Sequence, residues 1–170
     1  MPEIRNDETP IVRPARLGDA AGIYDLIKSY PDELIARPVS NIVQNIDRFV
    51  ICEDGGRLAG CAAWSILPEV GFPDRASVEL QSVAVDRARC RSGIGARLVR
   101  AVLERIRPFK PAQAIVLTVS PGFFRKLGFS EVPKAQLIHK IYTGCVNCMK
   151  HSNPFTCPET AMALDLRDEA

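Results

Sequence analysis

A short basic stretch rich in small residues, "CRSGIGA" (residues 90–96), has the composition of an anion-binding loop. Apolar residues at helical spacing follow it, so the stretch opens a helix. The first turn of a helix presents unpaired N–H groups and the positive end of the helix dipole. We therefore expect a phosphate group to bind here. The expected contacts are Arg91, Ser92, Gly93, Ile94, Gly95 and Ala96. Glycines that only allow tight strand-to-helix packing are the alternative.

Three cysteines and a histidine near the C-terminus form a second group of residues whose side chains could bind a metal or react. Cys145 and Cys148 form a C-x-x-C pair, and His151 and Cys157 follow within one loop. Thiolate and imidazole groups in this number could hold a tetrahedral zinc ion. A disulfide or redox-sensitive pair, and plain reduced thiols in a packed loop, are the alternatives, and reduced thiols without metal are favoured because the loop offers a single C-x-x-C knuckle.

The elements that must position these residues follow a mixed order of strands and helices. Strands are expected at residues 11–15, in a hairpin over 48–67 that turns at Gly55 and Gly56, and at 76–85, 114–119 and 160–166. Helices are expected after Asp19, after Ser40, from the glycine loop to Pro108, and over 121–129, where Gly128 ends the last one.

Length and composition describe one ordinary globular domain over residues 1–170, with a disordered start at 1–9 and a cysteine-containing loop at 143–158. The chain is 46% hydrophobic and 25% charged, and its net charge of +2 gives no reason to expect a nucleic-acid partner. No run has the length of a membrane helix or the pattern of a signal peptide. We therefore expect a cytoplasmic protein that does not bind membranes.

The glycine stretch lacks the third glycine of G-x-G-x-x-G and the Lys-Ser/Thr of a P-loop, which argues against both nucleotide-binding classes. Together with the strand before it, "SVAVDRARCRSGIGARLV" resembles the acetyl-CoA pyrophosphate loop of the GNAT acetyltransferases, and "FFRKLGF" resembles a second motif of that family. The resemblance implies an α/β fold, with a central mixed, mostly antiparallel sheet of about six or seven strands flanked by about four helices. It also implies acetyl-CoA as co-substrate, bound by Val83, Val85, the loop, Phe124 and Lys126.

The likeness extends over most of the chain to compact bacterial N-acetylglutamate synthases, through "LIARPVSNIVQNIDRFVICEDGGRLAGCAAW", "VELQSVAVD" and "KIY". These enzymes acetylate the α-amine of glutamate at the start of arginine biosynthesis. The resemblance makes Arg37 the arginine that binds the substrate carboxylate, and places Gln81 and Ser82 in the same acceptor site. An arginine in a solvated loop is the alternative for Arg37.

Three departures from the family pattern are visible. Cys90 replaces the usual Arg or Gln, and Phe124 replaces a tyrosine that can protonate the leaving thiolate. The segment "TGCVNCMKHSNPFTCPE" replaces an arginine-serine cluster of the longer synthases.

The implied mechanism is direct attack of the amine on the thioester in a ternary complex. Glu79, on the strand that carries the thioester in this family, is the expected general base, and the main-chain N–H of Val83 or Val85 is the expected oxyanion donor. A strand position without a catalytic role is the alternative for Glu79. His139, expected on a strand near the acceptor side, is a lesser acid–base candidate.

Two other functions stay open. The first is a GNAT enzyme with another amine acceptor, such as a polyamine, an antibiotic or a protein N-terminus. The second is a non-catalytic acyl-CoA sensor, which the absence of a tyrosine at position 124 would suit. Edge strands of such sheets often pair between subunits, so a homodimer is a further possibility.

Overall fold

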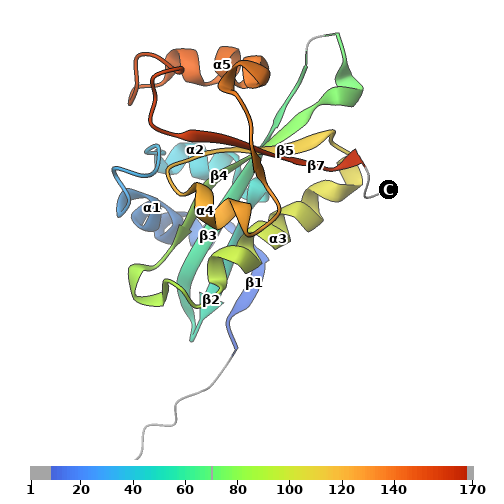
Figure 1. The fold of residues 1–170 in the computed structure, drawn as a ribbon. Coiled ribbons are helices and arrows are strands. Elements are labelled where there is room, and N and C mark those ends of the chain that lie inside the picture. Colours follow the sequence, from blue (N-terminus) through green and yellow to red (C-terminus); the bar gives the residue numbers. More distant parts are fainter. Residues whose placement is uncertain (1–8, 70, 168–170) are drawn as a thin grey trace, which may run out of the picture. The chain divides into compact units, whose positions relative to one another are not determined.

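The protein is described here by a computed structural model that covers residues 9–69 and 71–167. Residues 1–8, most of the expected disordered start, lie outside this range. The chain folds into two compact units, Met1–Ala63 with Ser82–Val102, and Trp64–Gln81 with Leu103–Ala170. Seven strands form one sheet in the order β1-β2-β3-β4-β5-β7-β6 (Figure 1). β4 and β5 are parallel and the other described ladders are antiparallel, which confirms a mixed, mostly antiparallel sheet.

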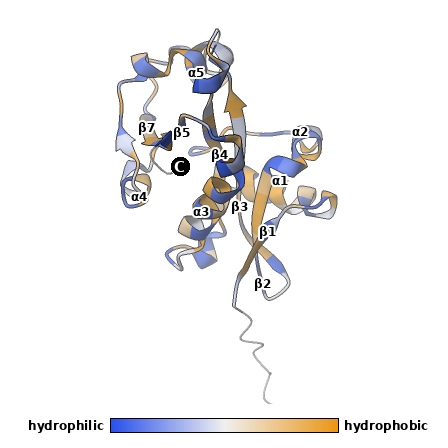
Figure 2. Ribbon diagram, turned by 90° about the vertical axis from the view of Figure 1, so that its right-hand side faces the viewer, coloured by the Kyte–Doolittle hydropathy of each residue, from blue (hydrophilic) through white to orange (hydrophobic). Residues whose placement is uncertain are grey.

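The first unit is built on the expected hairpin, β2 (Phe49–Asp54) and β3 (Arg57–Leu67). Gly55 and Gly56 join the strands with φ of 57° and 73°, the left-handed pair of a tight hairpin turn. Figure 2 shows apolar colour along the hairpin strands and polar colour at the turn. β1 (Ile11–Pro14) pairs with β2, and the end of β4 (Ser77–Val85) belongs to the same unit.

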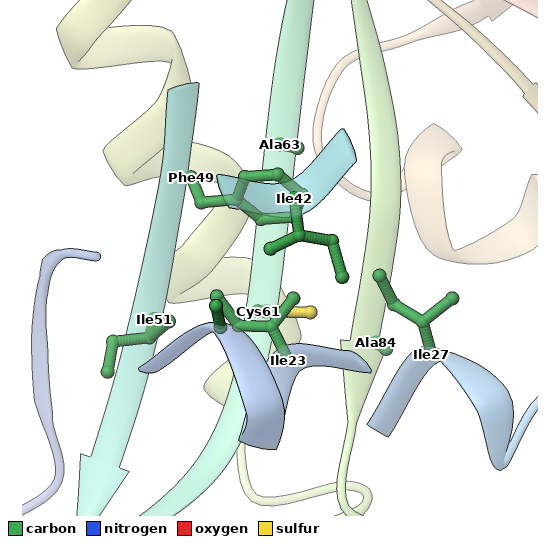
Figure 3. Close-up of a cluster of buried hydrophobic side chains, with 9 residues drawn as sticks. Ile23, Ile27, Ile42, Phe49, Ile51, Cys61, Ala63 and Ala84 are labelled. Atoms are coloured by element: carbon green, nitrogen blue, oxygen red, sulfur yellow. The ribbon is translucent and has the colours of Figure 1, made fainter. Parts of the chain in front are cut away.

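Two helices cover one face of these strands. α1 (Ala20–Lys28) directs Ile23 and Ile27 inward, and α2 (Val39–Gln44) directs Ile42 inward. Figure 3 shows these side chains meeting residues of the strands, among them Phe49 and Ile51. α2 begins one residue before Ser40 and has Pro38 at its cap, so the expected cap at Ser40 is wrong; the Pro38 carbonyl accepts the first helical N–H bonds instead.

The glycine loop leads into α3 (Ile94–Ile106), as expected. In the second unit β5 (Gln113–Thr118) pairs with β4 over Ser77–Glu79 and with β7 (Thr160–Asp165) along its whole length. α4 (Pro121–Arg125) leads to the two-residue strand β6 (Ser130–Glu131), which the sequence did not indicate. The core of this unit gathers Leu67, Ile115, Leu137 and Ala161.

The segment that contains His139 is a helix, α5 (Ile138–Thr143), so its expected strand is wrong. Leu137 and Ile141, four residues apart, are both buried, and this spacing fits one face of a helix. Tertiary packing has therefore overridden the strand preference of the Ile and Tyr residues.

Seven short 3-10 turns complete the described part of the chain. They are η1 (Leu17–Asp19), η2 (Ile46–Arg48), η3 (Pro73–Arg75), η4 (Arg87–Arg89), η5 (Arg107–Phe109), η6 (Lys134–Leu137) and η7 (Cys145–Asn147). Among the described helices, none is both long enough and apolar enough to span a bilayer.

Candidate active site

Strand β4 carries five of the residues selected from the sequence: Glu79, Gln81, Ser82, Val83 and Val85. Ser82 interrupts the regular strand because its φ is 51°, a left-handed value that is uncommon for a residue with a side chain. The Cys61 thiol donates to the Ser82 carbonyl at 3.4 Å and so holds this irregularity from the neighbouring strand. The sequence contains no glycine or asparagine at this point that would have indicated it.

Arg37 is fixed beside Ser82 in the first unit. Its Nε donates to Asn41 Oδ1 at 2.8 Å, and its Nη1 donates to Ser82 Oγ at 3.3 Å. The guanidinium also lies 5.2 Å from the centre of the Phe49 ring. Two of the three expected acceptor-binding residues are thus in contact, and the planar donor group is held in one orientation.

Glu79 is ion-paired, which the sequence analysis did not foresee. Its carboxylate lies 2.7 Å from the Nζ atom of Lys140, and the two side chains are 6% and 13% exposed, respectively. Gln81, the third expected acceptor-binding residue, donates to Glu79 Oε2 at 2.7 Å. A buried charge pair of this kind needs good geometry and further hydrogen bonds, and Gln81 supplies one. No local pattern in the sequence indicates Lys140, because its contact joins positions 61 apart.

The expected phosphate loop has a main chain shaped by two left-handed residues. Arg91 has a φ of 65° and Gly93 a φ of 82°. The first helical bond of α3 runs from Arg97 N–H to the Gly93 carbonyl, so the N–H groups of the preceding turn point away from the helix body. Ser92 Oγ donates to the Arg89 carbonyl at 2.5 Å, and a Cβ placed on Gly93 would have no neighbour within 4 Å. The main chain at this position is therefore open to a ligand.

The basic side chains around the loop are engaged to different degrees. Arg89 forms an ion pair with Asp54, and Arg87 stacks 4.2 Å from the centre of the Tyr30 ring and donates to the Ser29 carbonyl. Arg91 is exposed, and in the ranges that the structure describes it pairs with no acid. Arg91 is thus the arginine of this loop best placed to receive an anion.

Tyr30 is a structural residue that the sequence analysis missed. Its hydroxyl donates to the Val85 carbonyl at 2.5 Å and lies 3.8 Å from Cys90 Sγ. Burial, followed by the contact with Cys90, raises the pKa of Tyr30 to about 12. The hydroxyl therefore stays a neutral donor that ties the end of α1 to the end of β4.

Phe124 and Lys126 lie in and after α4. Phe124 is 4% exposed, and its ring centre is 4.9 Å from that of Phe123 and 5.5 Å from that of Phe129. Lys126 is exposed. Phe124 therefore packs in the core of the second unit. Its side chain carries no group that could protonate a thiolate.

The cysteine loop shows no cluster of metal-binding side chains among the described residues. Cys145, Cys148, Cys157 and His151 are half-buried, but within residues 9–69 and 71–167 no three His, Cys, Asp or Glu side chains are close enough to hold a metal ion. The Cys157 thiol lies 3.7 Å from Glu159 Oε2 instead. The tetrahedral zinc site that the sequence left open is therefore not assembled by these side chains.

Comparison with known proteins gives concordant matches. The sequence model of the acetyltransferase (GNAT) domain matches residues 45–131. An uncharacterised N-acetyltransferase of Chlorobaculum tepidum is 32% identical over 91% of this chain and 96% of its own length. An amino-acid acetyltransferase of Mycobacterium tuberculosis is 28% identical over 84% of this chain and 80% of its own length.

Two solved structures share the fold. A Mycobacterium tuberculosis protein, solved with CoA and NLQ, superposes with a TM-score of 0.75 at 23% identity, covering 92% of this chain and 99% of that one. N-acetylglutamate synthase of Neisseria gonorrhoeae, solved with coenzyme A and N-acetyl-glutamate, also gives 0.75 at 22% identity, covering 95% of this chain and 36% of that one.

Proposed function

We propose that this chain, which belongs to the GNAT acetyltransferase family, transfers the acetyl group of acetyl-CoA to the α-amine of an amino acid, and that this amino acid is L-glutamate. The acetyltransferase class and its donor follow from the family. The acceptor is our inference, and with it the entry step of arginine biosynthesis.

The placement of Arg37 carries the inference of an amino-acid acceptor. A half-buried guanidinium is held in one orientation by Asn41 and by Ser82 of β4. A guanidinium fork suits the carboxylate of an amino acid and would repel a polyamine. The name of the Mycobacterium tuberculosis relative, an amino-acid acetyltransferase, supports the same acceptor class.

The remaining roles follow from the chemistry of acyl transfer. Glu79 accepts a proton from the amine, which is mostly protonated at neutral pH. The main-chain N–H of Val83 donates to the carbonyl oxygen as it gains charge. The N–H groups of residues 91–96, with Arg91, bind the pyrophosphate. Val85, Phe124 and Lys126 are the further contacts that the family resemblance assigns to acetyl-CoA. Water protonates the departing thiolate, because Phe124 has no proton to give.

The first test is acetyl-CoA turnover, followed as free thiol release, against the amino acids, polyamines and a set of short peptides. We expect turnover with L-glutamate or its amide. Turnover of polyamines or peptide N-termini alone would contradict the amino-acid acceptor, and tight acetyl-CoA binding without any turnover would favour a sensor.

Replacement of Arg37 by alanine should raise KM for the acceptor by about 10- to 150-fold, the equivalent of one lost charge-assisted hydrogen bond. KM for acetyl-CoA should stay constant. Arg100→Ala removes an exposed arginine of α3 and serves as the matched control. An unchanged acceptor KM in Arg37→Ala, at a wild-type melting temperature, would remove Arg37 from the site.

A further inference from the structure

We propose that Lys140 is a positioning residue for Glu79, and that Gly144 is a glycine because the ammonium group of Lys140 occupies the space of its missing side chain. The inference rests on the proposed function, since it concerns the base of that reaction. Lys140 lies on α5, more than sixty positions from Glu79 in sequence, and was not among the residues selected from the sequence.

The contacts of Glu79 define which oxygen can act as the base. Lys140 Nζ lies 2.7 Å from Oε1 and 2.9 Å from Oε2, and Gln81 Nε2 donates to Oε2 at 2.7 Å. Each carboxylate oxygen accepts about two hydrogen bonds. Oε2 is therefore filled, whereas Oε1 keeps one accepting position within the described part of the chain. The amine proton accordingly goes to Oε1, and Lys140 fixes the direction in which that position points.

Gly144 supplies the independent observation. It follows the end of α5 with a φ of −134° and a ψ of −51°, so a left-handed backbone is not the reason for a glycine here. A Cβ at this position would lie 2.7 Å from Lys140 Nζ, a distance that real Cβ atoms essentially never show. The atom that it would displace is the end of a flexible side chain. Gly144→Ala should therefore move the ammonium group with little cost to the fold.

Three titratable groups face the carboxylate from the elements packed against it: Lys140 and His139 of α5, and Cys145 of η7. Burial, rather than Glu79, is the main influence on the pKa of both His139, which it lowers, and Cys145, which it raises. Of the three, Lys140 is the group that contacts the carboxylate directly, at 2.7 Å. Its removal should thus lower kcat.

The experiment compares kcat, KM for the acceptor and KM for acetyl-CoA of the wild type, Gly144→Ala and Lys140→Met, with the amine that the wild type turns over best. In both variants we expect kcat to fall, by about 100-fold for Lys140→Met as for a misplaced catalytic group. KM for acetyl-CoA should stay constant, because neither substitution touches the proposed donor loop. Gly18→Ala, which meets no atom within 4 Å, and Lys28→Met on the exposed face of α1 are the matched controls.

A second measurement needs no acceptor. Melting temperatures of Glu79→Gln, Lys140→Met and the double variant form a cycle, in which the double variant should lose much less than the sum of the single losses. Additive losses, or an unchanged kcat in Gly144→Ala, would overturn the inference. A wild type inactive on glutamate would overturn only the proposed acceptor, because the cycle would still report the pair. If Lys140→Met does not fold, Gly144→Ala decides.

Discussion

At the scale of single residues, the most informative side chains are the charged and titratable ones that lie wholly or partly buried. The ion pair with Lys140 holds the Glu79 carboxylate in one orientation, and the hydrogen bond to Ser82 does the same for the Arg37 guanidinium. Sequence patterns predicted Glu79 and Arg37 as candidates, because a known family carries such residues at these places. They could not predict Lys140 or Tyr30, since both act through contacts with residues far away in sequence.

His139 should make the protein sensitive to acid. Burial lowers its pKa below the usual 6.5, and its buried Nε2 has no hydrogen-bond partner in the described ranges. The fold therefore favours neutral imidazole, and this stabilisation is present above pH 6.5 and is lost as the pH falls through the lowered pKa. We expect the free energy of unfolding, measured with urea, to decline from pH 7 towards pH 5, and to decline less in His139→Leu.

The comparison variant is His151→Leu, which keeps His139 in place. It should retain the wild-type slope of stability against pH. Equal slopes in all three proteins would show that His139 does not contribute.

At the scale of elements, the loop before α3 depends on its left-handed main chain. Gly93→Ala places a side chain at a φ of 82°, which costs about 1–2 kcal/mol for a residue with a Cβ. Because the same main chain is proposed to bind pyrophosphate, we expect KM for acetyl-CoA to rise as well, with KM for the acceptor unchanged.

The hairpin turn offers the matched control for this loop. Gly56→Ala meets the same backbone penalty, at a φ of 73°, and like Gly93 has open space around its Cβ. It should lower the melting temperature similarly and leave KM for acetyl-CoA at the wild-type value. If KM for acetyl-CoA rose equally in both variants, the effect of Gly93→Ala would not come from the loop, and the proposed pyrophosphate contact would be wrong.

Most elements were predictable because they depend on local patterns. The alternation and paired glycines of the hairpin, the apolar spacing of α3 and the turn at Gly128 are all visible in the sequence. α5 and β6 were not predictable in this way. α5 contains the β-favouring Ile138, Ile141 and Tyr142, and tertiary packing sets its buried face; β6 is only two residues long.

At the scale of the whole molecule, the cysteines provide a test of the core. Cys52 and Cys61 are buried, Cys90 is exposed and the three cysteines of the loop are intermediate. Burial raises the pKa of both buried thiols, that of Cys61 to about 12, and only the thiolate reacts quickly.

A thiol reagent should therefore modify Cys90, Cys148 and Cys157 in the native protein, Cys145 more slowly because burial also raises its pKa, and Cys52 and Cys61 only after unfolding. Mass spectrometry of the labelled peptides identifies the sites. Rapid native labelling of Cys61 would contradict the described core. The homodimer expected from edge strands stays a prediction, to be measured by sedimentation on the same samples.

The left-handed Ser82 has a consequence for protein engineering. Along most of β4, β-branched residues should be accepted readily, as in strands generally. At position 82 the ranking inverts: valine, isoleucine and threonine are disfavoured by the φ of 51°, while asparagine and glycine fit the backbone. Substitution scores derived from regular strands would therefore rank variants wrongly at position 82. In the sequence this position stands between the proposed base, Glu79, and the proposed oxyanion donor, Val83.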